Sequence, residues 1–253
     1  MTERSYDIAE FTNRAPGSDP FYESICRAMV ATLKGNDVEA IKQIERAIDG
    51  FVAIGDIHGE GRARSKAVIL FRRNGDALRA IQEAERSLDC LRQHPDSGYA
   101  AMVYLETGQL EADRGNTNEA LRYYQTGLDL VGDSASGEDE VAASVRAFLS
   151  DVTANCFAVQ GKWDKVEKLR RSAIASLEEL NAPHLDRDLV IIYANLCRDY
   201  VYTHRPKDAG QALERGEMVL QTMSNREEFD PECRASLDSA SAQLNKLLLR
   251  LRR

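Results

Sequence analysis

The stretch that decides the fold is AMVYLETGQLEADRGNTNEALRYYQTGLDLV, residues 101–131. Its apolar residues recur with helical spacing on both sides of a break centred on Gly115. This pattern predicts two amphipathic helices joined by a tight turn. Asn116 and Glu119 have the spacing of a capping box, in which a side chain and a backbone N–H satisfy each other at a helix start. We therefore expect the second helix to begin at this asparagine.

Small and large residues alternate along the two predicted helices. Gly108 lies on the first helix, and Ala120 and Gly127 lie on the second. Residues without bulky side chains let two helices approach closely. Tyr104 and Tyr124 are large enough to fill the space beside them. The stretch therefore predicts a closely packed helical hairpin.

The same arrangement recurs along the chain, with a turn residue between the two helices of each pair. The turns fall at Gly35, Gly75, Gly115, Gly161 and His204. Successive turns are 40, 40, 46 and 43 residues apart. A recurring period of this length is typical of a helical repeat array.

Four columns of residues keep step with these turns. Five residues after each turn, the residues are Ala40, Ala80, Ala120, Val166 and Ala209. Seven residues further on, they are Ala47, Ser87, Gly127, Ala173 and Gly216. Seven residues before each turn, they are Ala28, Val68, Gly108, Ala154 and Cys197. Four residues before each turn, they are Ala31, Phe71, Glu111, Phe157 and Tyr200. The first three columns are mostly small and predict helix contacts, while the fourth is mostly aromatic and Glu111 departs from it.

These columns resemble the tetratricopeptide repeat (TPR), a helix–turn–helix unit of about 34 residues. The longer period is similar to TPR arrays of bacterial signalling proteins and kinesin light chains. The resemblance covers roughly residues 18–223. It implies an all-α fold, a right-handed helical solenoid of about five TPR-like helix pairs followed by a C-terminal capping helix.

The prolines and the turns set the expected boundaries. Residues 1–17 are polar and form an N-terminal tail, and the solenoid spans 18–253. We expect helix pairs near 18–55, 57–93, 97–131, 138–181 and 185–223. The insertion GDSASGEDE, residues 132–140, predicts an exposed loop between the third and fourth pairs.

The last predicted helix, residues 232–253, carries an apolar stripe with three interpretations. It caps the open edge of the fifth pair, or it begins a sixth repeat in a chain that continues past Arg253. A homodimer through this helix, using Leu247, Leu248 and Leu251, is the third. We favour the cap.

The TPR resemblance implies that the first helices of the pairs line a concave groove that binds a partner. Carried over by position, the groove residues are Arg62, Lys66, Arg72, Arg73, Gln109, Asn155, Asn195, Arg198 and Tyr202. The four basic residues form a cluster suited to carboxylates, a phosphorylated group or an acidic helix. The amides of Asn155 and Asn195 both donate and accept, which suits an extended peptide backbone. The alternative is that these side chains are merely the solvated faces of helices.

Composition limits the classes of partner and the compartment. The net charge of −8 argues against a non-specific nucleic-acid binder. No run of 18 apolar residues occurs, and the N-terminus lacks a signal-peptide core, so we expect no membrane span and a cytoplasmic location. The five cysteines are widely spaced without a CxxC pair, which indicates reduced, mostly buried thiols.

One short motif suggests chemistry. Gly55-Asp56-Ile57-His58-Gly59 matches the first metal-binding motif of calcineurin-like metallophosphoesterases. The companion motifs of that family are absent from the sequence, and the preceding residues have a helical pattern. We therefore interpret Asp56 as a helix cap between repeats, and we expect no metal, no cofactor and no catalytic site.

The sequence thus predicts a non-enzymatic scaffold that binds a protein or peptide segment in a TPR groove. The alternative function is a sensory or regulatory TPR region of a bacterial signalling protein whose output domain is separate or missing. The identity of the partner, the pathway and the oligomeric state stay open.

Overall fold

A computed structural model describes residues 20–93, 96–132, 140–225 and 230–251. Within these ranges the chain consists of helices, without a strand. The α-helices are α2 (Pro20–Leu33), α3 (Asp37–Ile54), α4 (Ile57–Arg73), α5 (Ala77–Gln93), α6 (Ser97–Asp113), α7 (Thr117–Val131), α8 (Glu140–Val159), α9 (Trp163–Leu180), α10 (Asp186–Tyr202), α11 (Pro206–Asn225) and α12 (Pro231–Leu251). A short 3₁₀ helix, η1 (Pro183–Leu185), precedes α10. The predicted tail and most of the loop at 132–140 lie outside the described residues.

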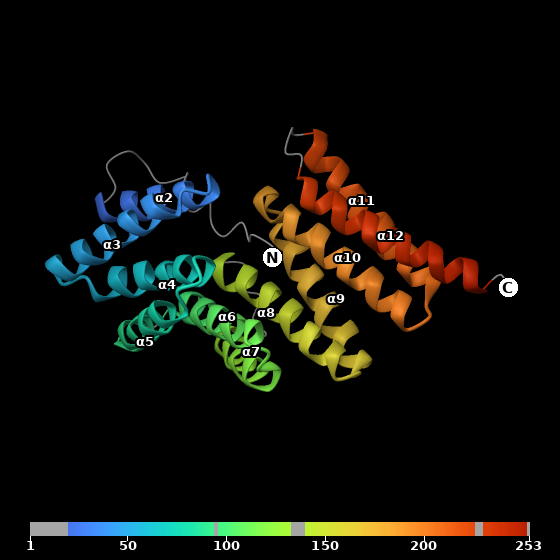
Figure 1. Ribbon diagram of the computed structural model, residues 1–253, viewed down its shortest axis with the longest axis horizontal. Helices are drawn as coiled ribbons and strands as arrows, with labels where there is room; N and C mark the ends of the chain where they lie inside the picture. Colours follow the sequence, from blue (N-terminus) through green and yellow to red (C-terminus); the bar gives the residue numbers. More distant parts are fainter. Residues whose placement is uncertain (1–19, 94–95, 133–139, 226–229, 252–253) are drawn as a thin grey trace. The chain divides into compact units, whose positions relative to one another are not determined.

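Each predicted turn reverses the chain through a residue in the left-handed conformation. The φ angles of Gly35, Gly75, Gly115, Gly161 and His204 lie between 59° and 82°. Glycine adopts this region without the steric cost that a Cβ imposes, which is why it marks four of the five turns. The helices on either side pair antiparallel, as α4 with α5 and α6 with α7 show in Figure 1.

The predicted columns form the contacts within the pairs. In the column five residues after each turn, all five side chains are fully buried. At Gly108, an added Cβ would overlap the ring of Tyr124. Glycine is required there because the two helices of the hairpin lie too close for a larger residue. The prediction of an all-α array of TPR-like pairs is confirmed.

The predicted capping box at Asn116 is wrong. Asn116 is the N-cap of α7, but its side chain accepts no hydrogen bond from that helix. Its Nδ2 instead donates to Glu111 Oε2 at 2.7 Å, and Arg114 Nη1 donates to Glu111 Oε1 at 2.7 Å. Glu111 therefore ties the turn together from the position that is aromatic in three of the other four repeats.

The described chain falls into two compact units, and the boundary lies within α8, between Leu149 and Ser150. The first unit holds α2 to α7 and the beginning of α8. A cluster of buried residues from α2 to α6 forms its core, including Ile44, Phe51 and Phe71. The second unit holds the rest of α8 and α9 to α12.

The last helix covers α10 and α11 with a buried apolar stripe. Cys233, Leu237, Ala240, Leu244 and Leu247 are each at most 7% exposed. A Cβ on Gly216 of α11 would lie 2.7 Å from Leu237 Cδ2, so a residue without a side chain is needed beneath α12. The helix therefore caps the fifth pair. Of the three leucines proposed for a homodimer, Leu247 belongs to this internal stripe, while Leu248 and Leu251 are exposed.

An aspartate fixes the start of α12. Asp230 Oδ1 accepts from the backbone N–H groups of Glu232 at 2.8 Å and Cys233 at 3.2 Å. Its other oxygen accepts from Arg187 Nε of α10 at 2.5 Å. The hydrogen bonds from Arg187 and the two backbone groups outweigh burial, which acts in the opposite direction, and lower the pKa of Asp230. One carboxylate therefore caps the helix and anchors it to its neighbour.

None of the described helices combines the length and the apolar character that crossing a membrane requires.

Candidate partner-binding face

In the first unit, two of the predicted groove residues of α4, Arg62 and Arg72, lie against carboxylates at α6. Arg62 donates to Asp96 Oδ2 from Nε at 3.0 Å and from Nη2 at 2.9 Å. Its guanidinium also lies 4.7 Å from the centre of the Tyr99 ring. Burial alone lowers the pKa of Arg62, but Tyr99 and Asp96 outweigh it and raise the pKa. The charge of this predicted groove residue is therefore compensated inside the unit.

Arg72, ten residues further along α4, has a similar environment. Its Nε donates to Glu106 Oε2 at 2.7 Å, and its Nη1 lies 3.6 Å from Asp113 Oδ2. The side chain of Glu106 is fully buried, and that of Arg72 is 16% exposed. Carboxylates of α6 thus neutralise Arg72, as Asp96 neutralises Arg62.

The other groove residues predicted in this unit differ in burial. Lys66 is 1% exposed, and its Nζ lies 5.3 Å from the centre of the Tyr99 ring. Arg73 and Gln109 are half-buried on α4 and α6. Lys66 therefore lies in the interior, whereas Arg73 and Gln109 reach solvent.

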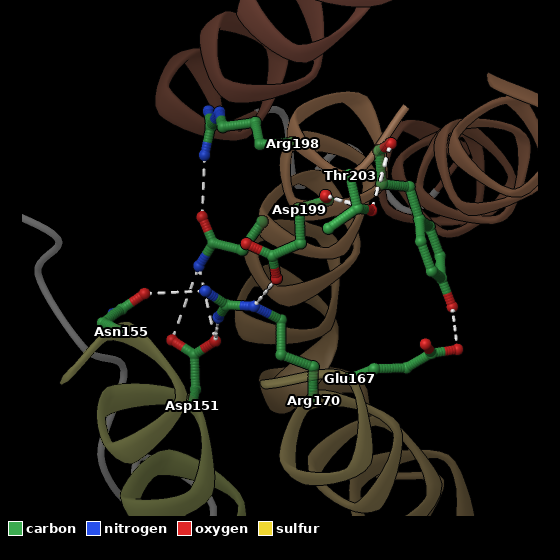
Figure 2. Close-up of polar contacts among 9 residues, drawn as sticks. Asp151, Asn155, Glu167, Arg170, Arg198, Asp199 and Thr203 are labelled. Atoms are coloured by element: carbon green, nitrogen blue, oxygen red, sulfur yellow. Dashed lines mark hydrogen bonds and ion pairs between the residues drawn. The ribbon is translucent and has the colours of Figure 1, made fainter. Parts of the chain in front are cut away.

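In the second unit, Arg170 of α9 organises a polar network beneath the first helices (Figure 2). It forms ion pairs with Asp151 of α8 and Asp199 of α10. Its Nη2 donates to Asn155 Oδ1 at 2.7 Å. Burial opposes the charge, yet the two carboxylates raise the pKa of Arg170. A single buried guanidinium therefore holds α8, α9 and α10 together.

Two asparagines on this network present amide nitrogens. Asn155 is exposed, and its oxygen accepts from Arg170 while its Nδ2 has no hydrogen-bond partner in the described chain. Asn195 of α10 accepts from Arg198 Nη1 at 2.7 Å. Its Nδ2 lies 3.4 and 3.5 Å from the oxygens of Asp151, which is long for a hydrogen bond. Both side chains therefore have their acceptors engaged and their donors open or weakly bonded.

Arg198 of α10 contacts only neutral acceptors among the described residues. Its Nη1 donates to Asn195, and its Nη2 donates to the backbone oxygen of Ser236 at 3.0 Å and to Ser236 Oγ at 3.2 Å. Burial and then the charge of Arg170 lower the pKa of Arg198. Asp151 and Asp199 act in the opposite direction from a distance, but both are hydrogen-bonded to Arg170. This half-buried cation is therefore only partly compensated.

Tyr202, at the end of α10, is 68% exposed and stacks on Trp163 with ring centres 4.5 Å apart. Beside this pair, Trp163, Leu196, Asp199 and Thr203 line part of a hollow of about 160 Å³. The aromatic pair therefore lies at the edge of a concave surface large enough for a side chain.

Sequence reasoning missed Arg170 and Ser236. It treated second helices as scaffold and placed no residue of α9 or α12 at the site. A signal was present, because Arg170 lies four residues after Val166 and three before Ala173 on the buried stripe of its helix. A charged residue on an apolar stripe indicates a buried ion pair.

The metallophosphoesterase-like motif lies between two helices. Asp56 is the N-cap of α4 and accepts from the backbone N–H of Gly59 at 2.8 Å. His58 Nε2 lies 3.2 Å from Asp96 Oδ2, in the ion pair of Arg62. The described residues contain no group of three or more histidine, cysteine or acidic side chains placed to hold a metal. The predicted capping role of Asp56 is confirmed.

The described structure contains no disulfide, and four of the five cysteines are buried. Burial raises the pKa of Cys197 to about 11 and also raises that of Cys156. Thiols with raised pKa values are weak nucleophiles. These cysteines therefore fill the core, as the sequence predicts.

No protein-family model matches the chain, and no curated protein matches it in sequence. Solved structures do match. BtubC from P. vanneervenii is 16% identical, with a TM-score of 0.62 over 81% of this chain and 84% of that one. A Rap protein complexed with competence and sporulation factor is 17% identical, with a TM-score of 0.62 over 92% of this chain and 58% of that one.

A third match is a STAND signal-transduction ATPase with a tetratricopeptide repeat sensor, from Pyrococcus horikoshii. It is 16% identical, with a TM-score of 0.64 over 88% of this chain and 33% of that one. At these identities the likeness establishes the fold alone. Together with the repeating turns and buried columns, it shows that the chain has the fold of TPR-repeat proteins.

Proposed function

We propose that the chain binds an extended protein or peptide segment across the first helices of its second unit. The observation that carries this proposal is the pair of amides at Asn155 and Asn195, whose acceptors are engaged internally and whose donors face no strong partner. Peptide carbonyl oxygens are the acceptors such donors need. Because Arg170 holds the side chain of Asn155 and Arg198 holds that of Asn195, little ordering cost is added on binding.

The structural neighbours support this proposal by analogy. The Rap protein of the same fold was solved in a complex with competence and sporulation factor. Binding in our proposal is non-enzymatic. Tyr202 would supply an aromatic surface at the edge of this face. In the first unit, Arg62, Arg72, Arg73 and Gln109 remain proposed contacts for a partner of that unit, whereas the predicted contact Lys66 is 1% exposed and does not reach one.

A second candidate is a sensory region that reports binding to an output domain. The match to a signal-transduction protein with a TPR sensor favours it, because there the repeats form part of a longer chain. In that case binding would shift an equilibrium between two states of the repeats. Self-association through α12 stays a further proposal.

Selection from a displayed library of random short peptides tests the proposed site. We expect the wild type to enrich a set of related peptides and the double variant Asn155→Ala/Asn195→Ala to bind them at least tenfold more weakly. Asn225→Ala, at an exposed position on α11, is the matched control. Circular dichroism verifies that each variant folds. A double variant that binds as tightly as the control would show that these amides are not the site.

A further inference from the structure

The donors of the candidate face outnumber the acceptors that the described chain offers them. Arg198 has five N–H groups, and three of them donate to Asn195 and Ser236. Two are therefore left without a hydrogen-bond partner among the described residues. The amide nitrogens of Asn155 and Asn195 add further donors on the same face. A ligand that satisfies this face must be rich in acceptors.

The charge of Arg198 indicates which kind of acceptor the ligand carries. No carboxylate lies within 4.0 Å of Arg198 in the described part of the chain, whereas Arg187, on the same helix, pairs with both Asp230 and Glu232 of α12. An arginine that is partly removed from water without an anion is electrostatically unfavourable, and a carboxylate from a partner relieves this cost.

We infer that the bound segment carries an aspartate or glutamate side chain, or a C-terminal carboxylate, that pairs with Arg198. This inference rests on the proposed function, since it names the chemistry of the partner at the same face. The carboxylate would accept from a remaining N–H group of Arg198, while Asn155 and Asn195 donate to backbone carbonyl oxygens beside it.

The geometry also gives Ser236 of α12 a positioning role. Its backbone oxygen and hydroxyl fix one end of the guanidinium, and Asn195 fixes the other. The guanidinium of Arg198 is thus oriented before the ligand arrives, which favours a charge-assisted hydrogen bond from a remaining N–H group to a carboxylate. The final helix therefore shapes the recognition site as well as covering the fifth pair.

The experiment repeats the random-peptide selection with variants of Arg198. We expect wild-type peptides to share an acidic residue or to depend on a free C-terminus, and Arg198→Gln to weaken their binding about tenfold or more. Arg198→Lys keeps the charge but loses the oriented guanidinium, so its loss should be smaller. Arg198→Glu should instead enrich peptides with lysine or arginine at the same position. Arg215→Gln and Arg215→Glu, at an exposed position on α11, are the charge-matched controls.

Three results are informative. An acidic preference that Arg198→Gln abolishes and Arg198→Glu inverts, with Arg215 variants unchanged, supports the inference. Peptides that bind the wild type without an acidic preference, or equally well to the Arg198 variants, overturn it and leave the proposed function intact. A wild type that enriches no peptide overturns the proposed function, and the inference with it.

Discussion

Arg62 and Arg72 lie on a first helix of the first unit, and Arg198 lies on a first helix of the second unit. Their side chains have different hydrogen-bond acceptors. Arg62 and Arg72 donate to Asp96 and Glu106, carboxylates supplied at the next first helix. Arg198 donates to an amide, a hydroxyl and a backbone oxygen. In the first unit the described chain itself supplies the carboxylates that pair with these arginines. In the second unit it orients Arg198 with neutral acceptors, and in our inference the carboxylate comes from the partner.

The second unit contains its own contrast. Arg187 and Arg198 both extend from α10 to α12, at the beginning of that helix and one turn further on. Arg187 pairs with Asp230 and Glu232, and these carboxylates raise its pKa although burial opposes the shift. The pKa of Arg198 is lowered. The two arginines therefore differ because α12 places carboxylates beside Arg187 and only neutral oxygens beside Arg198.

The largest effect is expected where a paired cation is removed from the interior. Arg170→Ala strands Asp151 and Asp199 beneath the first helices, so we expect the second unit to lose about 3–5 kcal/mol of unfolding free energy. Trp163, the single tryptophan of the chain, lies in this unit and reports its unfolding in urea by fluorescence.

Arg171→Ala provides the matched control for Arg170. Its side chain is 60% exposed, pairs with Glu167 and donates to the Tyr200 hydroxyl at 2.8 Å, so removal should cost about 1 kcal/mol. Equal urea midpoints for the two variants would contradict the assignment of Arg170 as the residue that holds three helices together.

The pair Arg72–Glu106 tests whether ion pairing in the first unit contributes to the free energy of unfolding. A double-mutant cycle with Arg72→Met and Glu106→Gln should give a coupling energy of about 1.5–3 kcal/mol, because the carboxylate is fully buried. Circular dichroism in urea measures it. The exposed pair Arg92–Asp89 should give a coupling energy below about 1 kcal/mol. A coupling energy for Arg72–Glu106 no larger than this would remove the contrast with Arg198.

The sequence predicted the repeating fold because its evidence is local and repeated. The turn at Gly115 needs a left-handed residue and Gly108 must admit Tyr124, and such requirements recur once per repeat. Whether Arg72 or Arg198 finds a carboxylate depends on residues 34 and 38 positions away along the chain. Position on a first helix therefore predicted the candidate residues of the site. Whether each arginine is paired with a carboxylate depends on residues distant in sequence, which only the folded structure brings close.

Acid should weaken the anchored end of α12. Because the pKa of Asp230 is lowered in the folded state, its contribution to stability is present above the unfolded pKa of about 3.9 and is lost as pH falls through the folded value. We expect the second unit to lose about 1 kcal/mol through this group below roughly pH 4. Urea titrations monitored by Trp163 fluorescence across this range measure the loss.

Asp230→Asn isolates the charge, since asparagine also caps helices well. Its stability should be lower than that of wild type at neutral pH and should depend less on pH below 4. Asp238→Asn, at a side chain 66% exposed, should keep the wild-type profile. An unchanged profile in Asp230→Asn would show that the anchor of α12 lies elsewhere.

The smallest effect on stability is expected at Arg198. Arg198→Leu removes three hydrogen bonds to neutral acceptors, but it also removes a half-buried charge that lacks a carboxylate. These terms oppose each other, so we expect a change within about 1 kcal/mol in either direction. Urea unfolding followed at Trp163 measures it. A loss of about 3 kcal/mol or more, the size of a broken buried ion pair, would mean that Arg198 is a structural cation like Arg170. A near-neutral change would instead fit a residue whose charge the fold itself does not need.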